Sequence, residues 1–113
     1  MRMAVANAIP AIVTLHGELD IATIEAVRET LFSLAREPRQ LIVDLTDVSF
    51  CGWAGVRMLL EFQREVAEPG QTVLAGCSPG LLRVMDIADV RALFDLADTV
   101  DEARDHLLTE VSC

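Results

Sequence analysis

The chain has 113 residues, of which 9 are basic and 18 are acidic, so its formal net charge at pH 7 is −9. This length supports one domain with its own core, whereas two domains of half the size would each be marginal. All nine basic residues are arginines, and they are spread from Arg2 to Arg104. Binding to nucleic acid or to an anionic membrane surface needs clustered cations, so this spread argues against both functions. We therefore expect a single domain over residues 1–113. Its negative net charge favours a partner with a basic surface.

The sequence offers no membrane span or disulfide framework. Its longest stretch without formal charge, Met3 to Gly17, is shorter than the roughly 18 residues that a spanning helix needs. Pro10 interrupts this stretch and one basic residue precedes it, which is unlike a signal peptide. Three cysteines, an odd number, favour free thiols over disulfides: Cys51, Cys77 and Cys113. The protein is therefore expected in the cytoplasm. The sequence predicts neither a metal site nor a cofactor.

The first third of the chain predicts a hairpin and a helix. The β-branched run Ile9–Leu15, ended by the turn-prone His16-Gly17, predicts a strand, and a weaker strand over Met3–Ala6 precedes it. A helical period then begins at Ile21, with Asp20 placed as its N-cap. The inward face of this helix is expected to hold Ile21, Ile24, Val27, Leu31 and Leu34.

The middle third predicts a buried strand and a second helix. The apolar run Leu41–Leu45 is typical of a strand covered on both faces. After Thr46–Cys51 a helix begins near Trp53, and Arg57 is spaced to pair with Glu61 one turn later. Its expected inward residues are Val56, Leu59, Leu60 and Val66.

The last third repeats the pattern with shorter elements. A strand is expected over Thr72–Ala75, and Ser78-Pro79 predicts an N-cap and first residue of a third helix with Leu81, Leu82, Met85 and Ala88 inward. Leu93–Leu96 predicts a last short strand, and Thr99–Glu102 forms a capping-box pattern before a fourth helix. Strands alternating with helices predict an α/β fold with a mixed, mostly parallel sheet of four to five strands and four helices, the first hairpin adding an antiparallel edge.

Ligands and partners of such sheets meet the carboxyl ends of the strands. Four segments are expected there: Glu18–Asp20, Asp47–Gly55, Cys77–Gly80 and Ala97–Thr99. The second joins a buried strand to a helix through small residues, yet it holds the chain's single tryptophan. Trp53 is either a core residue or an exposed contact anchor. Its position, about 300° around the helix from Val56 at roughly 100° per residue, favours exposure.

These motifs resemble the STAS domain of bacterial anti-sigma factor antagonists. The resemblance rests on Gly17-Glu-Leu-Asp20 after a strand, the buried strand Leu41–Leu45, and Val48–Val56 opening a helix, and it covers nearly the whole chain. It implies a non-enzymatic regulator that binds a serine-kinase-type anti-sigma factor and frees the sigma factor. Asp20 matches an acidic residue of the family near the partner-binding surface.

The resemblance also implies a lost switch. The family carries an Asp-Ser-Ser-Gly or Asp-Ser-Ala-Gly motif at the start of the second helix, where the kinase phosphorylates the first serine and so blocks binding. By position this motif falls on Gly52, Trp53, Ala54 and Gly55, so the acceptor hydroxyl is replaced by an indole. The implied contact surface comprises Asp20, Gly52, Trp53, Ala54, Gly55 and Arg57. Phosphorylation at Trp53 is impossible.

Two functions therefore remain open. One is an antagonist that phosphorylation at the usual site cannot switch off. The other is an interaction or regulatory subunit of a different assembly, such as a lipid-transport complex, in which the tryptophan marks loss of kinase recognition. A homodimer is compatible with either.

Other chemistry is weaker. Cys51 and Cys77 each precede a helix start, which can lower a thiol pKa, and with Cys113 they are redox candidates, although Cys51 also suits a small buried position. The absence of lysine excludes a P-loop, and both histidines suit the surface. Three carboxylates could share one end of the sheet and bind a divalent cation: Glu18, Asp20 and Asp47. They are better interpreted as solvated side chains in loops.

Overall fold

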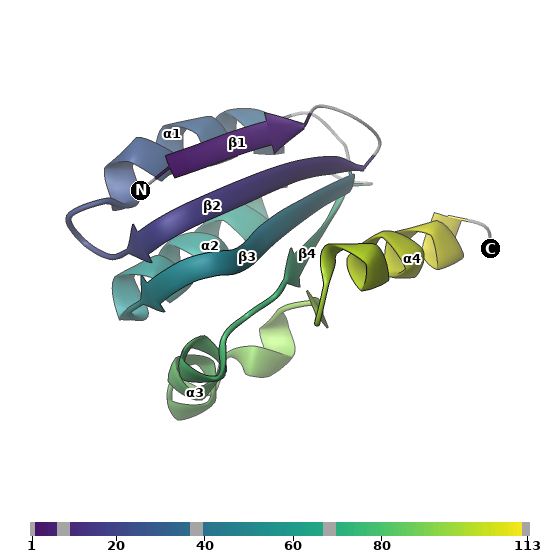
Figure 1. The fold of residues 1–113 in the computed structure, drawn as a ribbon. Coiled ribbons are helices and arrows are strands. Elements are labelled where there is room, and N and C mark those ends of the chain that lie inside the picture. The colour runs from purple at the N-terminus through teal and green to yellow at the C-terminus, as the bar shows by residue number, and fades with distance from the viewer. Residues whose placement is uncertain (1, 7–9, 37–39, 67–69, 112–113) are drawn as a thin grey trace.

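The computed structural model describes residues 2–6, 10–36, 40–66 and 70–111 (Figure 1). The strands are β1 (Arg2–Ala6), β2 (Ala11–Leu19), β3 (Gln40–Cys51), β4 (Gln71–Ala75) and β5 (Leu96–Ala97). The α-helices are α1 (Ile24–Ala35), α2 (Trp53–Glu65), α3 (Pro79–Ile87) and α4 (Val100–Val111). The sheet order is β1-β2-β3-β4-β5, with β1 antiparallel to β2 and every other pairing parallel, which confirms the predicted α/β fold.

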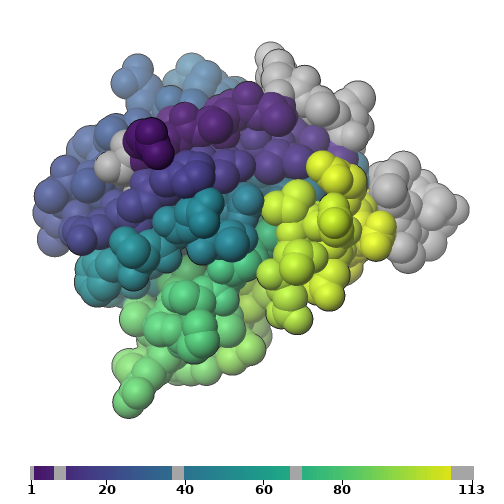
Figure 2. All heavy atoms as spheres, in the orientation of Figure 1, coloured from purple at the N-terminus to yellow at the C-terminus, as the bar shows by residue number. Residues whose placement is uncertain are grey.

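The helices cover the two faces of the sheet unequally. The main core joins inward residues of β2 and β3 to α1, α2 and α3, with Phe62 and Leu31 fully buried in it. A smaller cluster on the other face packs α4 residues Ala103 and Leu107 against Ile42. Figure 2 shows that α4 covers only part of that face and leaves atoms of β1, β2 and β3 visible beside it. None of the described helices has the length and apolar character needed to cross a membrane.

Strand β3 is far longer than the predicted Leu41–Leu45. Its register against β2 advances by one extra residue at two places, from Thr14–Asp44 to His16–Asp47 and from Gly17–Val48 to Glu18–Phe50. Each is a β-bulge, which leaves two successive outward residues. Val48 and Cys51 are therefore buried while the residue pairs 46–47 and 49–50 face outward. These bulges carry the strand to the start of α2.

The segment before α1 departs from prediction. His16-Gly17 is not a turn, because β2 continues through Gly17 with a φ of 107° and ends at Leu19. Asp20 is not the N-cap of the helix, which begins at Ile24 after Thr23. The Asp20 carboxylate instead accepts a hydrogen bond of 2.9 Å from the backbone N–H of Ala22. This extra turn moves Ile21 off the helix and out of the core.

The other helix boundaries largely follow the sequence. Ser78 accepts a hydrogen bond of 3.1 Å from the N–H of Leu81, and Pro79 is the first residue of α3, as predicted. Leu60 in α2 and Val66 just after it are only partly buried. The fully buried residues of α2 include Met58 and Phe62, which the sequence pattern does not indicate.

The last short strand is present but lies later than the predicted Leu93–Leu96. A 3-10 turn occupies Arg91–Leu93, and β5 follows at Leu96–Ala97. The capping box is also altered. The Thr99 hydroxyl accepts from the N–H of Glu102, but the Glu102 carboxylate accepts from the N–H of Asp98.

Candidate functional site

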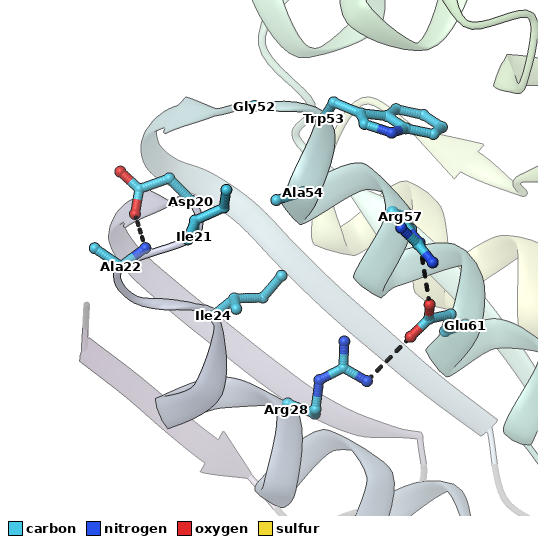
Figure 3. Close-up of a pocket in the computed structure, with 10 residues that line it drawn as sticks. All are labelled: Asp20, Ile21, Ala22, Ile24, Arg28, Gly52, Trp53, Ala54, Arg57 and Glu61. Carbon is cyan, nitrogen blue, oxygen red and sulfur yellow. Dashed lines mark hydrogen bonds and ion pairs between the residues drawn. The ribbon is translucent and has the colours of Figure 1, made fainter.

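A groove of about 850 Å³ lies between the starts of α1 and α2 (Figure 3). One wall comes from the turn before α1 and its first residues: Asp20, Ile21, Ala22, Ile24 and Arg28. The other wall comes from the N-cap and the first three turns of α2: Gly52, Trp53, Ala54, Arg57 and Glu61. We call this cavity the α1–α2 groove. It brings together Asp20 and the start of the second helix, which lie more than thirty residues apart in the sequence.

The parallel pairing of β2 and β3 places the turn before α1 next to the start of α2. The strands end side by side, with Leu19 paired to Cys51, and the N–H of Gly52 donates to the Leu19 carbonyl at 3.3 Å. The turn to α1 and the start of α2 therefore leave the sheet at the same edge. Gly55 fits against this junction because a Cβ there would lie 2.8 Å from the Leu19 carbonyl oxygen and 2.7 Å from the Cys51 sulfur.

The upper part of the groove is apolar and exposed. Trp53 is 48% exposed, as its helical position indicates, and Ile21 is 81% exposed. Figure 3 shows Ile21 on one side and Trp53 on the other, with the small side chain of Ala54 between them. We call these three residues the apolar mouth.

The lower part of the groove is charged and internally paired. Arg28 on α1 lies 3.0 Å from a carboxylate oxygen of Glu61 on α2. The second oxygen of Glu61 lies 3.4 Å from Nε of Arg57, which confirms the predicted pair one turn apart. The Arg28 guanidinium also stands 5.2 Å from the ring centre of Phe32. The ion pair between Arg28 and Glu61 closes this end of the groove.

The STAS domain family model matches residues 2–103. The chain belongs to the STAS domain family. Its curated relatives are distant. Osmosensory protein A of Mycobacterium tuberculosis is 27% identical over 118 residues, covering 89% of this chain and 73% of the relative. The anti-sigma-B factor antagonist of Bacillus subtilis is 28% identical over 86 residues, covering 75% of this chain and 79% of the relative.

Solved structures share the fold. An anti-sigma factor antagonist from Mycobacterium paratuberculosis superposes with a TM-score of 0.84 at 22% identity, covering 99% of this chain and 94% of that one. The antagonist SpoIIAA in its unphosphorylated form has a TM-score of 0.78 at 24% identity, covering 96% and 97%. The fold of this STAS domain is thus that of anti-sigma factor antagonists.

Other segments expected near the site lie outside the groove. Neither Cys77–Gly80 nor Ala97–Thr99 is among the residues that line it. Asp47 lies 3.3 Å from Nδ1 of His16, across the first bulge. In the described ranges, no three metal-binding side chains gather closely enough to hold an ion.

The two described cysteines of this STAS domain have raised, not lowered, thiol pKa values. Burial raises the pKa of Cys51 from 9.0 to about 12, and the nearby Cys77 adds to this shift. Burial raises the pKa of Cys77 to about 11, although Arg91 and a backbone hydrogen bond act in the opposite direction. The expectation that the helix starts lower these pKa values is therefore wrong. Cys113 lies outside the described residues.

Two exposed apolar residues differ from what the sequence pattern predicts. The spacing of Ile21 fits the inward face of the helix, yet the residue is exposed. Phe50 is 54% exposed. Its ring lies beside Gly52, because a Cβ on that glycine would be 3.4 Å from the nearest ring carbons. Simple alternation gives no signal for the exposure of Phe50, because the buried positions of β3 change from a spacing of two residues to a spacing of three at the bulges.

Proposed function

We propose that this STAS domain is an anti-sigma factor antagonist, which binds a serine-kinase-type anti-sigma factor and thereby frees the sigma factor. The observation that carries the proposal is the α1–α2 groove, which unites Asp20 with the start of α2 around two exposed apolar side chains. The names of the relatives support it, since the Bacillus subtilis protein is named an anti-sigma-B factor antagonist. The contact surface comprises Asp20, Gly52, Trp53, Ala54, Gly55 and Arg57. The domain acts by binding rather than by catalysis.

We also propose that phosphorylation at the usual family site cannot switch off binding to the anti-sigma factor. Trp53 stands where the family resemblance puts the acceptor serine, and an indole offers no oxygen to phosphorylate. Gly52, at the N-cap of α2, supplies no carboxylate beside that position. Control through thiol oxidation is not part of the proposal, because burial keeps Cys51 and Cys77 protonated at neutral pH.

The test combines binding, sigma release and phosphorylation. The protein should recover a serine-kinase-type anti-sigma factor from its own cell extract, and the purified pair should release sigma factor in a competition assay. Incubation with that kinase and ATP should leave the start of α2 unmodified. The double variant Gly52→Asp, Trp53→Ser should become phosphorylatable at position 53.

The matched control is Leu93→Ser, because Leu93 is 53% exposed and lies on the 3-10 turn outside the groove. Trp53→Ser should weaken anti-sigma binding, whereas Leu93→Ser should not. A phosphate on the start of α2 in the wild-type protein contradicts the proposed insensitivity to phosphorylation. Recovery of only transporter or membrane components overturns the antagonist function in favour of a subunit of another assembly.

A further inference from the structure

The two large side chains of the apolar mouth, Ile21 and Trp53, are not required to fill the core. Ile21 lies in a turn and is 81% exposed, so it contributes little to the core. Trp53, on α2, is half exposed although Val56, Met58 and Leu59 already fill the core beneath that helix. Single exposed apolar residues are ordinary, but two that line one cavity indicate a contact site.

The shape of the groove limits what it can hold. Its α2 wall is formed by Trp53, Arg57 and Glu61 at successive turns, which spans roughly 12 Å along a helix axis. The ion pair between Arg28 and Glu61 closes the far end. The small side chain of Ala54 leaves space in the mouth (Figure 3). One large apolar side chain, with about two turns of the backbone that carries it, matches these dimensions.

Sheet topology excludes an added strand at this place. The strands that end at the groove are β2 and β3, and each is paired on both sides in the order β1-β2-β3-β4-β5. Strand addition needs a free sheet edge, whereas a groove between two helices suits an amphipathic helix. A helical occupant therefore suits this place better than an added strand.

Charge sets the orientation of that helix. The wall on the α1 side contributes the carboxylate of Asp20. Two exposed acidic residues, Glu18 and Glu25, lie next to this wall without lining the groove, and Glu25 is 3.6 Å from Arg28. The α2 wall carries Arg57, whose side chain is 70% exposed. The whole chain is also acidic, with a net charge of −9. Opposite charges across an interface fix the register and speed association.

We infer that the α1–α2 groove binds an amphipathic helix of the anti-sigma factor, which inserts one large apolar side chain between Ile21 and Trp53 and places basic residues against the acidic α1 side. This inference rests on the proposed function for the identity of the partner. It adds the chemistry of the contact: an apolar anchor flanked by lysine or arginine within one helical turn.

Site-specific crosslinking tests the occupant directly. A photoreactive benzoylphenylalanine replaces Ile21 in one variant and Ile87 in a control, because Ile87 is 78% exposed at the end of α3, outside the groove. Each variant is irradiated with the purified anti-sigma factor, and the linked peptide is identified by mass spectrometry. The expected link from position 21 is to a helical segment with an apolar residue and neighbouring basic residues. A link only from position 87, or one to an acidic or strand segment, overturns the inference.

Affinity measurements give an independent readout. Ile21→Ser should weaken anti-sigma binding by roughly 10- to 100-fold, the range expected when one large aliphatic contact is lost. Ala54→Leu should weaken it similarly by filling the mouth, whereas Ile87→Ser should leave it within twofold. Thermal unfolding checks that each variant is folded.

The outcomes separate the inference from the proposed function. If the wild type binds the anti-sigma factor and releases sigma factor but Ile21→Ser and Ala54→Leu bind equally well, the function stands and the helix-in-groove contact is wrong. If the wild type does not bind that kinase at all, the proposed function fails and the inference about its helix fails with it.

Discussion

Glu61 on α2 holds Arg28 on α1 with one carboxylate oxygen, at 3.0 Å, and Arg57 on its own helix with the other, at 3.4 Å. One carboxylate thus joins the two helices that form the groove. The side chains of Arg28 and Glu61 are 34% and 37% exposed, so solvent screens the pair only in part. The pair lies at the end of the groove opposite the apolar mouth and links its two walls.

A double-mutant cycle on this pair should measure a modest coupling. Arg28→Met, Glu61→Gln and the double variant should give a coupling free energy of about 0.5–1 kcal/mol at low salt, because partly exposed pairs are weak. The coupling should shrink in 1 M salt, where charges are screened within a few ångströms. Urea unfolding at both salt concentrations provides the values. A coupling that does not respond to salt would mean that packing, not charge, joins the helices.

Replacing Gly55 should destabilise the domain for steric reasons. A Cβ at this position would approach the Leu19 carbonyl oxygen to 2.8 Å, and backbone cannot yield cheaply. Gly55→Ala is therefore expected to lower the free energy of unfolding by roughly 1–3 kcal/mol. The control is Gly80→Ala in α3, where the nearest atom lies 3.9 Å away, so helix propensity should make it neutral or stabilising by up to about 1 kcal/mol. Equal effects at both glycines would contradict the steric argument.

Trp53 supplies a built-in optical probe because it is the single tryptophan of the chain. Because Trp53 is 48% exposed, the free protein should emit at long wavelength and be readily quenched by acrylamide. Emission should change little on unfolding in urea, because the indole is already half solvated. A blue-shifted, quencher-resistant spectrum in the folded protein would place the indole in the core and remove it from the contact surface.

The sequence predicted the fold well because its core pattern is strong. Alternation of strands and helices gave the right element order, and Ser78-Pro79 marked the start of α3 correctly, since each of these depends on local chemistry. The length of β3 was not predictable from simple alternation. Its buried residues Leu45, Val48 and Cys51 are spaced by three, and that spacing has meaning only once the two bulges against β2 are known.

The candidate site was predicted in part for the same reason. Asp20 and Trp53 were both expected at the carboxyl edge of the sheet, and the parallel pairing of β2 and β3 brings them to one groove. Ile21 was misplaced because its spacing to Ile24 fits a helical face. The turn held by the Asp20 carboxylate delays the helix by three residues, and sequence spacing does not reveal such a turn.

The buried thiols should make stability fall at alkaline pH. Burial raises the pKa of Cys51 from 9.0 to about 12 and that of Cys77 to about 11. Between pH 9 and these values the unfolded chain loses thiol protons that the native state keeps, so the free energy of unfolding decreases as pH rises. Cys51→Ala should flatten this decrease in urea titrations between pH 8 and 10.5. In the native wild type, iodoacetamide should label both thiols slowly at pH 7.5; rapid labelling of folded protein would contradict the raised values.

Thr72 offers the clearest route to a more stable protein. It is 4% exposed in β4, and its hydroxyl has no hydrogen-bond partner among the residues that the structure describes. A buried hydroxyl without a partner costs roughly 1–3 kcal/mol, and valine has nearly the same shape and suits a strand. Thr72→Val should therefore raise the free energy of unfolding by about 1 kcal/mol in urea denaturation. Thr72→Ser keeps the hydroxyl and removes a buried methyl group, so it should lower stability by a similar amount. If valine destabilises the domain while serine does not, the hydroxyl is satisfied in the folded protein and its removal is what costs stability.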